Sequence, residues 1–259
     1  MRAIEWDSPG DQSVAEYYAK DPNIDATPHK GSVLSARFQG LVARVRVDAY
    51  TDGTSYGDVV ALIDALGADQ AVLIGHDWGC ALAWQVARSE PGRVRAVAGL
   101  SVPYPGLGPK APTEQMRAAF GERFFYQLYF QQPEVPEQEL EADVRDFLRR
   151  MYHALSGPGM QEKFRAEKPV TGLLDILQPP TGGQPDWMRE SDLDVYVERF
   201  EHSGLTGPIN WYRAMDASWR QQKEDGRERI HPPALFIAGK EDPVIQFAGK
   251  ALERMPTMM

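Results

Sequence analysis

The chain has 259 residues and is acidic, with a formal net charge of −9 at pH 7 and a pI near 5.1. This length allows one sizeable core with an inserted cap, and the acidity argues against nucleic acid or an anionic membrane as a partner. No apolar run approaches the about 20 residues that cross a bilayer, and the N-terminus lacks the apolar centre of a signal peptide. We therefore expect a cytoplasmic protein. Its one cysteine, Cys80, excludes an internal disulfide and a cysteine-rich metal site, and we expect neither a metal nor a cofactor.

The first 47 residues carry little pattern, and the clear signals begin after them. Residues 1–47 are predicted to form an irregular N-terminal segment, with a strand near its end at residues 41–47. A helix is predicted at residues 56–66 because its apolar side chains share one face and Gly67 follows. A short buried strand at residues 71–74, a second helix and a second strand at residues 94–102 come next. These consecutive β–α units predict an α/β fold with a mostly parallel sheet.

The second half of the chain lacks the alternation of strands and helices until residue 233. Residues 101–112 are rich in proline and glycine and should leave the sheet. An aromatic run follows, and then three helices are predicted, at residues 137–155, 192–201 and 209–221. Residues 233–240 restore a buried strand. We therefore expect a core at residues 48–103, a helical lid at residues 104–230 over the carboxyl edge of the sheet, and a return to the core at residues 231–259.

The turn between the strand at residues 71–74 and its following helix reads GHDWG, residues 75–79. Small residues that flank a polar one at a strand-to-helix turn are typical of a nucleophile elbow. The sharp turn strains the central residue, and we expect that only glycine leaves room at Gly75 and Gly79. The central residue is Asp77, and a carboxylate there would attack a saturated carbon and form an ester with the enzyme. The alternative interpretation is that Asp77 only caps the helix.

Four segments together resemble the epoxide hydrolases of the α/β-hydrolase fold. They are the elbow GHDWG, the lid segment FFYQLYFQQPEV, the helix GPINWYRAM and the strand end LFIAGKEDPV. The resemblance covers residues 48–250 and implies an α/β-hydrolase fold with an inserted helical lid. It implies that Asp77 opens an epoxide and that two lid tyrosines, Tyr126 and Tyr212, hydrogen-bond the epoxide oxygen. Asp242, by the same resemblance, corresponds to the acid that orients a catalytic histidine.

The chemistry explains why these residue types belong together. Ring opening places negative charge on the epoxide oxygen, and a neutral phenol can give that oxygen a hydrogen bond and then a proton. The ester is then cleaved by water that a histidine activates, while backbone N–H groups, that of Trp78 among them, stabilise the oxyanion. The product would be a vicinal diol, and the aromatic lid favours a hydrophobic epoxide as substrate.

Each assignment has a plainer alternative. Tyr126 lies in an aromatic run in which core packing is ordinary, and Tyr129 is a rival three residues away. Tyr212 neighbours Trp211, so either ring can simply be buried. Asp242 precedes a proline and is also a common type of turn residue.

The chain departs from the family pattern in two places. No histidine follows His231, so the base that activates water is missing, and no His-Gly-x-Pro loop precedes the elbow. We therefore expect a fold that is incomplete at both ends, as in a truncated or mis-read gene, and turnover that stops at the ester. Uncovered sheet edges would favour association, in the simplest case into a homodimer.

Two other functions stay open. A haloalkane or haloacid dehalogenase also uses an elbow aspartate on this fold; Trp78 is compatible with one, whereas the paired tyrosines argue against it. A non-catalytic ligand-binding protein or a defective fragment is compatible with the missing histidine.

Overall fold

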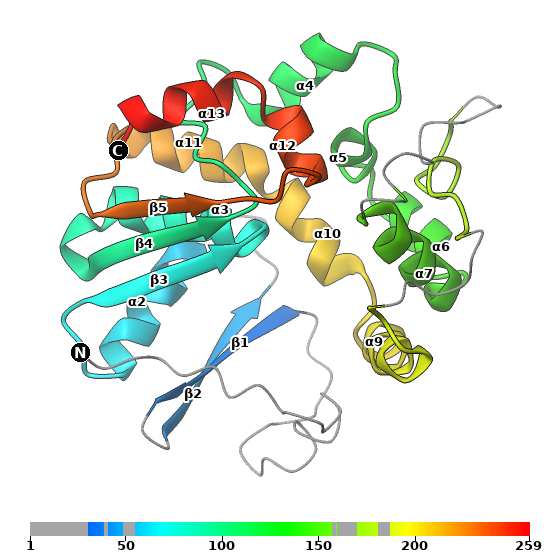
Figure 1. Ribbon diagram of the computed structural model, residues 1–259, viewed down its shortest axis with the longest axis horizontal. Coiled ribbons are helices and arrows are strands. Elements are labelled where there is room, and N and C mark those ends of the chain that lie inside the picture. The colour runs from blue at the N-terminus through cyan, green and yellow to red at the C-terminus, as the bar shows by residue number, and fades with distance from the viewer. Residues whose placement is uncertain (1–30, 39–40, 49–54, 157–158, 160–169, 181–186) are drawn as a thin grey trace. The chain divides into compact units, whose positions relative to one another are not determined.

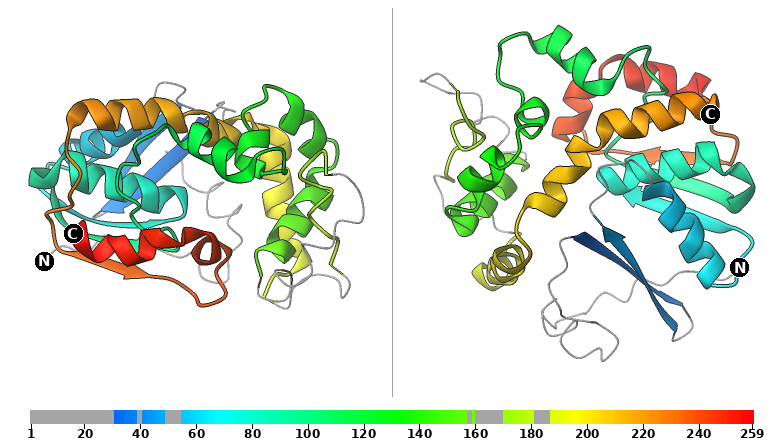
Figure 2. Two further views of the ribbon diagram at one scale, coloured as in Figure 1. Left: turned by 90° about the horizontal axis from the view of Figure 1, so that it is seen from above. Right: turned by 180° about the vertical axis from the view of Figure 1, so that it is seen from behind.

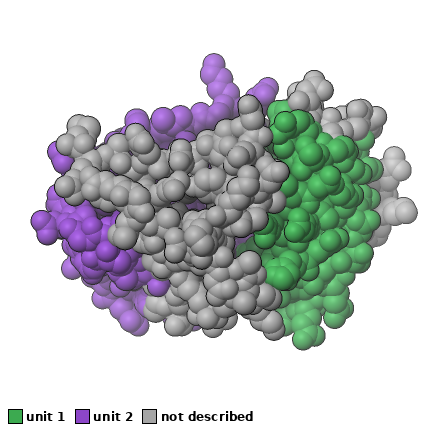
Figure 3. All heavy atoms as spheres, turned by 90° about the horizontal axis from the view of Figure 1, so that it is seen from below, with its two compact units in different colours: residues 1–49, 124–210 green, residues 50–123, 211–259 purple. Residues whose placement is uncertain are grey.

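The computed structural model describes residues 31–38, 41–48, 55–156, 159, 170–180 and 187–259. The chain divides into two compact units, which Figure 3 colours separately. Unit 1 comprises residues 1–49 and 124–210, and unit 2 comprises residues 50–123 and 211–259. The predicted lid, residues 104–230, contributes to both units, so its boundaries stay a prediction. The predicted irregular structure of residues 1–30 lies outside the described residues.

Unit 2 is built on a three-stranded parallel sheet (Figure 1). Its strands are β3 (Ala71–His76), β4 (Val94–Leu100) and β5 (Ala234–Ile237), and β4 lies between the other two. Both pairings are parallel, which confirms the α/β prediction. Because parallel strands end at the same edge, the segments that follow β3, β4 and β5 meet at one side of the sheet.

Helix α3 (Trp78–Ser89) joins β3 to β4 and supplies much of the core of unit 2. Its Cys80 and Trp84 are almost completely buried, which confirms Cys80 as a small core residue. A Cβ atom at Gly99 of β4 would come within 2.1 Å of the Trp84 ring, so only glycine lets this helix approach the strand so closely. The Cys80 thiol and the Trp84 indole both donate hydrogen bonds to the Val102 carbonyl, at 3.0 and 2.9 Å. The helix is thereby anchored at the carboxyl end of β4.

Further helices complete unit 2. They are α2 (Ser55–Ala65), α4 (Pro112–Phe120), α11 (Met215–Asp225), α12 (Pro243–Ala248) and α13 (Lys250–Arg254), with short 3₁₀ turns at Pro91–Arg93 and Met255–Thr257. Helix α2 confirms the predicted helix at residues 56–66, and Gly67 follows it with a φ of 63°. Helices α2, α3 and α11 lie on the same side of the sheet (Figure 2). The Asp216 carboxylate of α11 accepts hydrogen bonds from the Thr113 amide and hydroxyl of α4, at 3.0 and 2.6 Å.

The prediction that the strands are buried was wrong for one face of this sheet. Ile74 of β3 is 71% exposed, and Leu235 of β5 is 55% exposed. Both residues are paired with Ala98 of β4, so their side chains lie on the same face. The opposite face carries Val97, which is 2% exposed within the core of unit 2. A continuous apolar run in the sequence does not show that a second layer covers both faces of its strand.

Unit 1 contains a β-hairpin and a set of helices. Strands β1 (Gly31–Phe38) and β2 (Leu41–Asp48) are antiparallel, and β2 confirms the strand predicted at residues 41–47. The helices are α5 (Tyr126–Tyr129), α6 (Val135–Leu140), α7 (Val144–Ala154), α9 (Glu190–Ser203) and α10 (Thr206–Arg213), and the last of these ends in unit 2. In the described part of the chain, none of the helices combines the length and the apolar character that a membrane span requires.

Two predicted helices are each divided in the structure. The helix predicted at residues 137–155 is broken before α7, because the Asp143 carboxylate accepts a hydrogen bond from the Asp146 amide at 2.9 Å and so caps a new helix. The helix predicted at residues 209–221 is interrupted at Ala214, the single residue between α10 and α11. The helix predicted at residues 192–201 is confirmed as α9, which Gly204 follows with a φ of 69°.

Candidate active site

The elbow places Asp77 between the end of β3 and the start of α3. Its φ of 52° and ψ of −122° are a strained conformation for a residue with a side chain, of the kind that costs about 1–3 kcal/mol and collects at functional sites. The surrounding backbone holds it there. The Asp77 amide donates to the Leu100 carbonyl of β4 at 3.4 Å, and the Asp77 carbonyl accepts from the Cys80 and Ala81 amides at 3.0 and 3.1 Å.

The two glycines of the elbow have different roles. A Cβ atom on Gly75 would come within 2.1 Å of the Gly79 carbonyl oxygen, so the strand and the helix can meet there only at glycine. A Cβ atom on Gly79 would meet nothing within 4 Å. The expectation that both glycines are required for space is therefore correct for Gly75 and wrong for Gly79, because Gly79 already belongs to the first turn of α3 and is exposed.

The electrostatic setting of Asp77 favours a reactive carboxylate over a simple cap. Its side chain makes no capping hydrogen bond to α3, contrary to the alternative interpretation. Crowding by protein atoms raises the pKa of the Asp77 carboxyl above its ordinary value, although the residue as a whole is exposed. The neighbouring His76 and the adjacent Trp78 amide oppose this rise in pKa, and the Asp242 carboxylate adds to it.

Aromatic side chains gather next to Asp77 within unit 2. The Trp78 ring meets Tyr212 edge to face, with ring centroids 5.0 Å apart and an interplanar angle of 88°. It also contacts Trp211, at 5.8 Å and 34°. Such edge-to-face pairs restrict both rings. Because Trp78 directly follows Asp77, this contact holds the Tyr212 ring close to the elbow.

Asp242 follows β5 and lies at the same edge of the sheet as the elbow. It caps helix α12, because its carboxylate accepts a hydrogen bond from the Val244 amide at 2.9 Å. One carboxylate oxygen of Asp242 therefore makes the local contact that the plainer interpretation, a turn residue, predicts. Its electrostatic effect on Asp77 also places it in the environment of the elbow.

Tyr126 belongs to unit 1. The other predicted site residues all belong to unit 2: Asp77, Trp78, Tyr212 and Asp242. Tyr126 is the first residue of α5 and is half-buried. Its ring packs edge to face on Phe130, with centroids 5.7 Å apart. Its phenol oxygen accepts a hydrogen bond from the Gln127 amide group at 2.8 Å. Gln127 was not predicted from the sequence, since a glutamine beside a tyrosine carries no signal of its own.

The rival tyrosine, Tyr129, is committed to a different contact. It is 5% exposed, and its phenol donates a hydrogen bond of 2.6 Å to the Glu139 carboxylate. Burial and that carboxylate raise the pKa of the Tyr129 phenol well above its usual range. Glu139 also accepts hydrogen bonds from the Leu173 and Leu174 amides, both at 3.0 Å. Tyr129 therefore helps to anchor a loop of unit 1, which favours Tyr126 as the tyrosine that takes part in chemistry.

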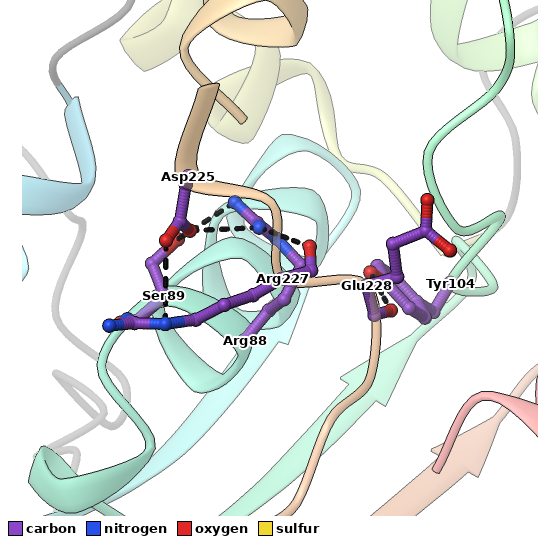
Figure 4. A network of polar contacts seen from close by, with 6 residues as sticks. All are labelled: Arg88, Ser89, Tyr104, Asp225, Arg227 and Glu228. Carbon is purple, nitrogen blue, oxygen red and sulfur yellow. Dashed lines mark hydrogen bonds and ion pairs between the residues drawn. The ribbon is translucent and has the colours of Figure 1, made fainter. Parts of the chain in front are cut away.

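A buried polar network holds the other end of helix α3 (Figure 4). The Arg88 side chain is 1% exposed and forms an ion pair with Asp225 of α11 at 2.9 Å. Arg88 also donates to the Arg227 carbonyl at 2.6 Å and to the Ser89 hydroxyl at 2.8 Å. The Arg227 guanidinium donates in turn to the Ser89 carbonyl. The network joins the helix that begins at the elbow to the segment that leads into β5.

Tyr104, which follows β4, adds a second link to the segment that leads into β5. Its phenol donates to the Glu228 carbonyl at 2.8 Å, and burial raises the pKa of Tyr104 to about 12. Among the described residues, no group of three or more histidine, cysteine, aspartate and glutamate side chains has the arrangement of a metal site.

Comparison with known proteins agrees with this architecture. A family model described as the alpha/beta hydrolase fold matches residues 25–252. Epoxide hydrolase A of Mycobacterium tuberculosis is 40% identical over 204 residues, which are 78% of this chain and 63% of that protein. The chain thus spans less than two thirds of this relative. Epoxide hydrolase B of the same organism is 30% identical over 272 aligned residues, covering 92% of this chain and 76% of that protein.

Solved structures give the same result. Epoxide hydrolase A from Mycobacterium thermoresistibile has a TM-score of 0.72 at 38% identity, covering 84% of this chain and 72% of that one. An epoxide hydrolase from an endophytic Streptomyces has a TM-score of 0.75 at 35% identity, covering 85% of this chain and 71% of that one. The chain therefore belongs to the α/β-hydrolase fold family and, within it, to the epoxide hydrolases.

Proposed function

We propose that this protein opens a hydrophobic epoxide by nucleophilic attack of the Asp77 carboxylate, on the route to a vicinal diol. The observation that carries the proposal is the strained backbone of Asp77 at the elbow, beside the packed Trp78 and Tyr212 rings. The relatives that bear the name epoxide hydrolase support it. In the first step an Asp77 oxygen bonds to an epoxide carbon, the carbon–oxygen bond of the ring breaks, and an alkyl-enzyme ester forms.

Tyr126 and Tyr212 are the proposed acids for this step. The breaking carbon–oxygen bond leaves its electron pair on the epoxide oxygen, and a phenol gives that oxygen a hydrogen bond and then its proton. The Tyr129 phenol donates its hydrogen bond to Glu139, which supports Tyr126 rather than Tyr129 as the acid. The contact between Tyr212 and Trp78 supports a fixed position of the second phenol relative to the elbow.

The Trp78 amide is the proposed oxyanion donor for the second step. Water attacks the carbonyl carbon of the ester, so the oxyanion forms on an oxygen of Asp77 itself. The Trp78 N–H group is near enough to the Asp77 carboxyl to lower its pKa. A donor in that position needs no rearrangement to stabilise the tetrahedral intermediate.

The second step of the proposed reaction requires a base that activates water. The family resemblance assigns the activation of water to a histidine after Asp242, and no histidine follows His231. Positioned bases of this kind contribute about 10²–10⁴-fold to a rate. Without such a base, the ester would accumulate faster than the diol is released.

Halide displacement is the second candidate. Dehalogenases of this fold need N–H donors for the leaving halide, and the indoles of Trp78 and Trp211 lie together, with ring centroids 5.8 Å apart. The paired candidate tyrosines favour the epoxide. Release of bromide from an alkyl bromide, with no adduct from an epoxide, would support the second candidate.

Intact-protein mass spectrometry after incubation with an aryl epoxide tests the proposal, with Asp77→Asn alongside. A single adduct of the mass of the epoxide, absent in the variant, would support Asp77 as the nucleophile. Diol release without an adduct would support the activity and show that the ester is hydrolysed faster than it forms. Folded protein that yields neither an adduct nor a diol would overturn the proposed function in favour of a non-catalytic binding protein.

A further inference from the structure

We infer that Gln127 is a positioning residue that holds the Tyr126 phenol and strengthens it as a proton donor to the epoxide oxygen. The inference rests on the proposed function, in which Tyr126 is one of the two acids. It adds a residue that acts on the phenol rather than on the substrate. The contact that carries it is the hydrogen bond of 2.8 Å from the Gln127 side-chain amide to the phenol oxygen.

The setting of this contact is well defined within unit 1. The Tyr126 ring packs on Phe125 and Phe130 at centroid distances of 5.2 and 5.7 Å. The Gln127 carbonyl accepts a separate hydrogen bond, from the Gln131 side chain at 2.9 Å. The donor and the acceptor therefore both belong to one short, packed segment, and the phenol oxygen has a fixed orientation relative to the amide.

The direction of this hydrogen bond gives it a chemical effect. While Tyr126 is neutral, its oxygen accepts from a neutral amide, which contributes little. As the phenol O–H bond breaks and its proton passes to the epoxide oxygen, negative charge grows on the phenol oxygen, and the amide donor then interacts with a charge. Hydrogen bonds to charged groups are about twice as strong as neutral ones. The Gln127 contact is therefore stronger in the transition state than in the ground state, which is the condition for accelerating a step.

The contrast with Tyr129 supports this assignment. Tyr129 donates to a carboxylate, and loss of its proton would place two negative charges side by side. Tyr126 accepts from an amide that cannot itself be deprotonated at ordinary pH. Tyr126 and Tyr129 therefore differ in their hydrogen-bond partners. The amide partner of Tyr126 stabilises the phenolate that forms when this tyrosine releases its proton.

The rate of adduct formation in a single turnover tests the inference. Gln127→Leu keeps the size of the side chain and removes the donor, and it should slow adduct formation by about 2- to 12-fold, the range of one hydrogen bond. Gln127→Glu should slow it further, because it replaces the donor with a charge that repels the developing phenolate. The control is Gln131→Leu, which removes a neighbouring amide of the same segment that donates to the Gln127 backbone carbonyl.

A double variant separates this role from a structural one. In a Tyr126→Phe background, Gln127→Leu should have no further effect on the rate. An equal loss in that background, or a loss as large in Gln131→Leu, would overturn the inference and leave the proposed function standing. Failure of the unaltered protein to form any adduct would overturn the proposed function, and with it the catalytic role of Gln127.

NMR gives a readout that does not depend on activity. In protein labelled with ¹³C at the tyrosine Cζ atoms, the Tyr126 resonance is identified by its loss in Tyr126→Phe. It should move in Gln127→Leu and stay in place in Gln131→Leu, because only the first substitution changes the hydrogen bond to the phenol oxygen. An unmoved resonance in Gln127→Leu would show that the contact does not form in solution and would overturn the inference.

Discussion

The buried pair Arg88–Asp225 predicts an asymmetric response to mutation. The Arg88 side chain is 1% exposed, whereas the Asp225 side chain is 24% exposed. Removing the carboxylate charge with Asp225→Asn leaves a guanidinium in the core with no counter-charge. Removing the guanidinium with Arg88→Met leaves a carboxylate that reaches water and keeps Arg227 at 3.4 Å. Asp225→Asn changes the shape of the side chain less than Arg88→Met does, but it should lower the free energy of unfolding more.

The magnitudes follow from these environments. Breaking a buried ion pair so that one charge stays buried costs about 3–5 kcal/mol, and we expect Asp225→Asn to lower the free energy of unfolding by an amount in that range. For Arg88→Met the cost should be about 1–3 kcal/mol, that of polar groups left without a partner, because the remaining charge is hydrated. The matched control is Arg145→Met, which breaks a surface pair of 38% and 59% exposed side chains with Asp194. It should cost at most about 1 kcal/mol.

Urea unfolding at pH 7, followed by tryptophan fluorescence and circular dichroism, measures these differences. The expected order of destabilisation is Asp225→Asn, then Arg88→Met, then Arg145→Met. If Arg88→Met were as costly as Asp225→Asn, the exposure of the remaining charge would not control the cost, and the reasoning would be wrong. Because Arg88 lies on the helix that begins at the elbow, loss of the pair should also slow adduct formation, which mass spectrometry would detect.

Three further predictions concern the site. Gly75→Ala should prevent stable folding, since its Cβ atom would meet a carbonyl oxygen at 2.1 Å, while Gly79→Ala should leave the melting temperature unchanged or raise it slightly, since its Cβ atom meets nothing and alanine favours a helix over glycine; equal melting temperatures would contradict this. Adduct formation should be lost as the pH falls through the pKa of Asp77, which is raised above 3.8, because the protonated carboxyl cannot attack; a midpoint at or below 3.8 in a pH–rate profile would refute it. Tyr129→Phe should lower the free energy of unfolding in urea by about 1–3 kcal/mol and leave the rate of adduct formation within about twofold. Tyr126→Phe should slow adduct formation more than Tyr129→Phe does and lower the free energy of unfolding less. The opposite ranking of the two rates would show that Tyr129 is the acid.

Local patterns were enough to predict the centre of the fold. The strand at residues 71–74, the helix after it, the strand at residues 94–102 and their parallel pairing all appear in unit 2. Their signals are short-range, because apolar periodicity and glycine positions depend on residues a few places apart. The strained backbone of Asp77 follows from the same pattern, since the turn between strand and helix has few solutions.

Other features depend on individual side-chain contacts that apolar spacing does not show. The break before α7 is set by the cap at Asp143, whereas the apolar residues on either side of it keep a helical spacing. The choice between Tyr126 and Tyr129 depends on Glu139, ten residues after Tyr129, which accepts a hydrogen bond from that phenol. The two tyrosines lie in the same aromatic run and look equivalent in sequence.

The sequence by itself determined the elements of the core, the elbow and the family, because each rests on local periodicity or on a motif whose residues are neighbours. Only the tertiary structure decided which face of the sheet is covered, which glycine of the elbow is sterically required and which tyrosine has a carboxylate partner. These are properties of packing. Whether Ile74 is exposed or Gly75 is crowded depends on what lies opposite the residue in space, and that is set by the folded chain as a whole.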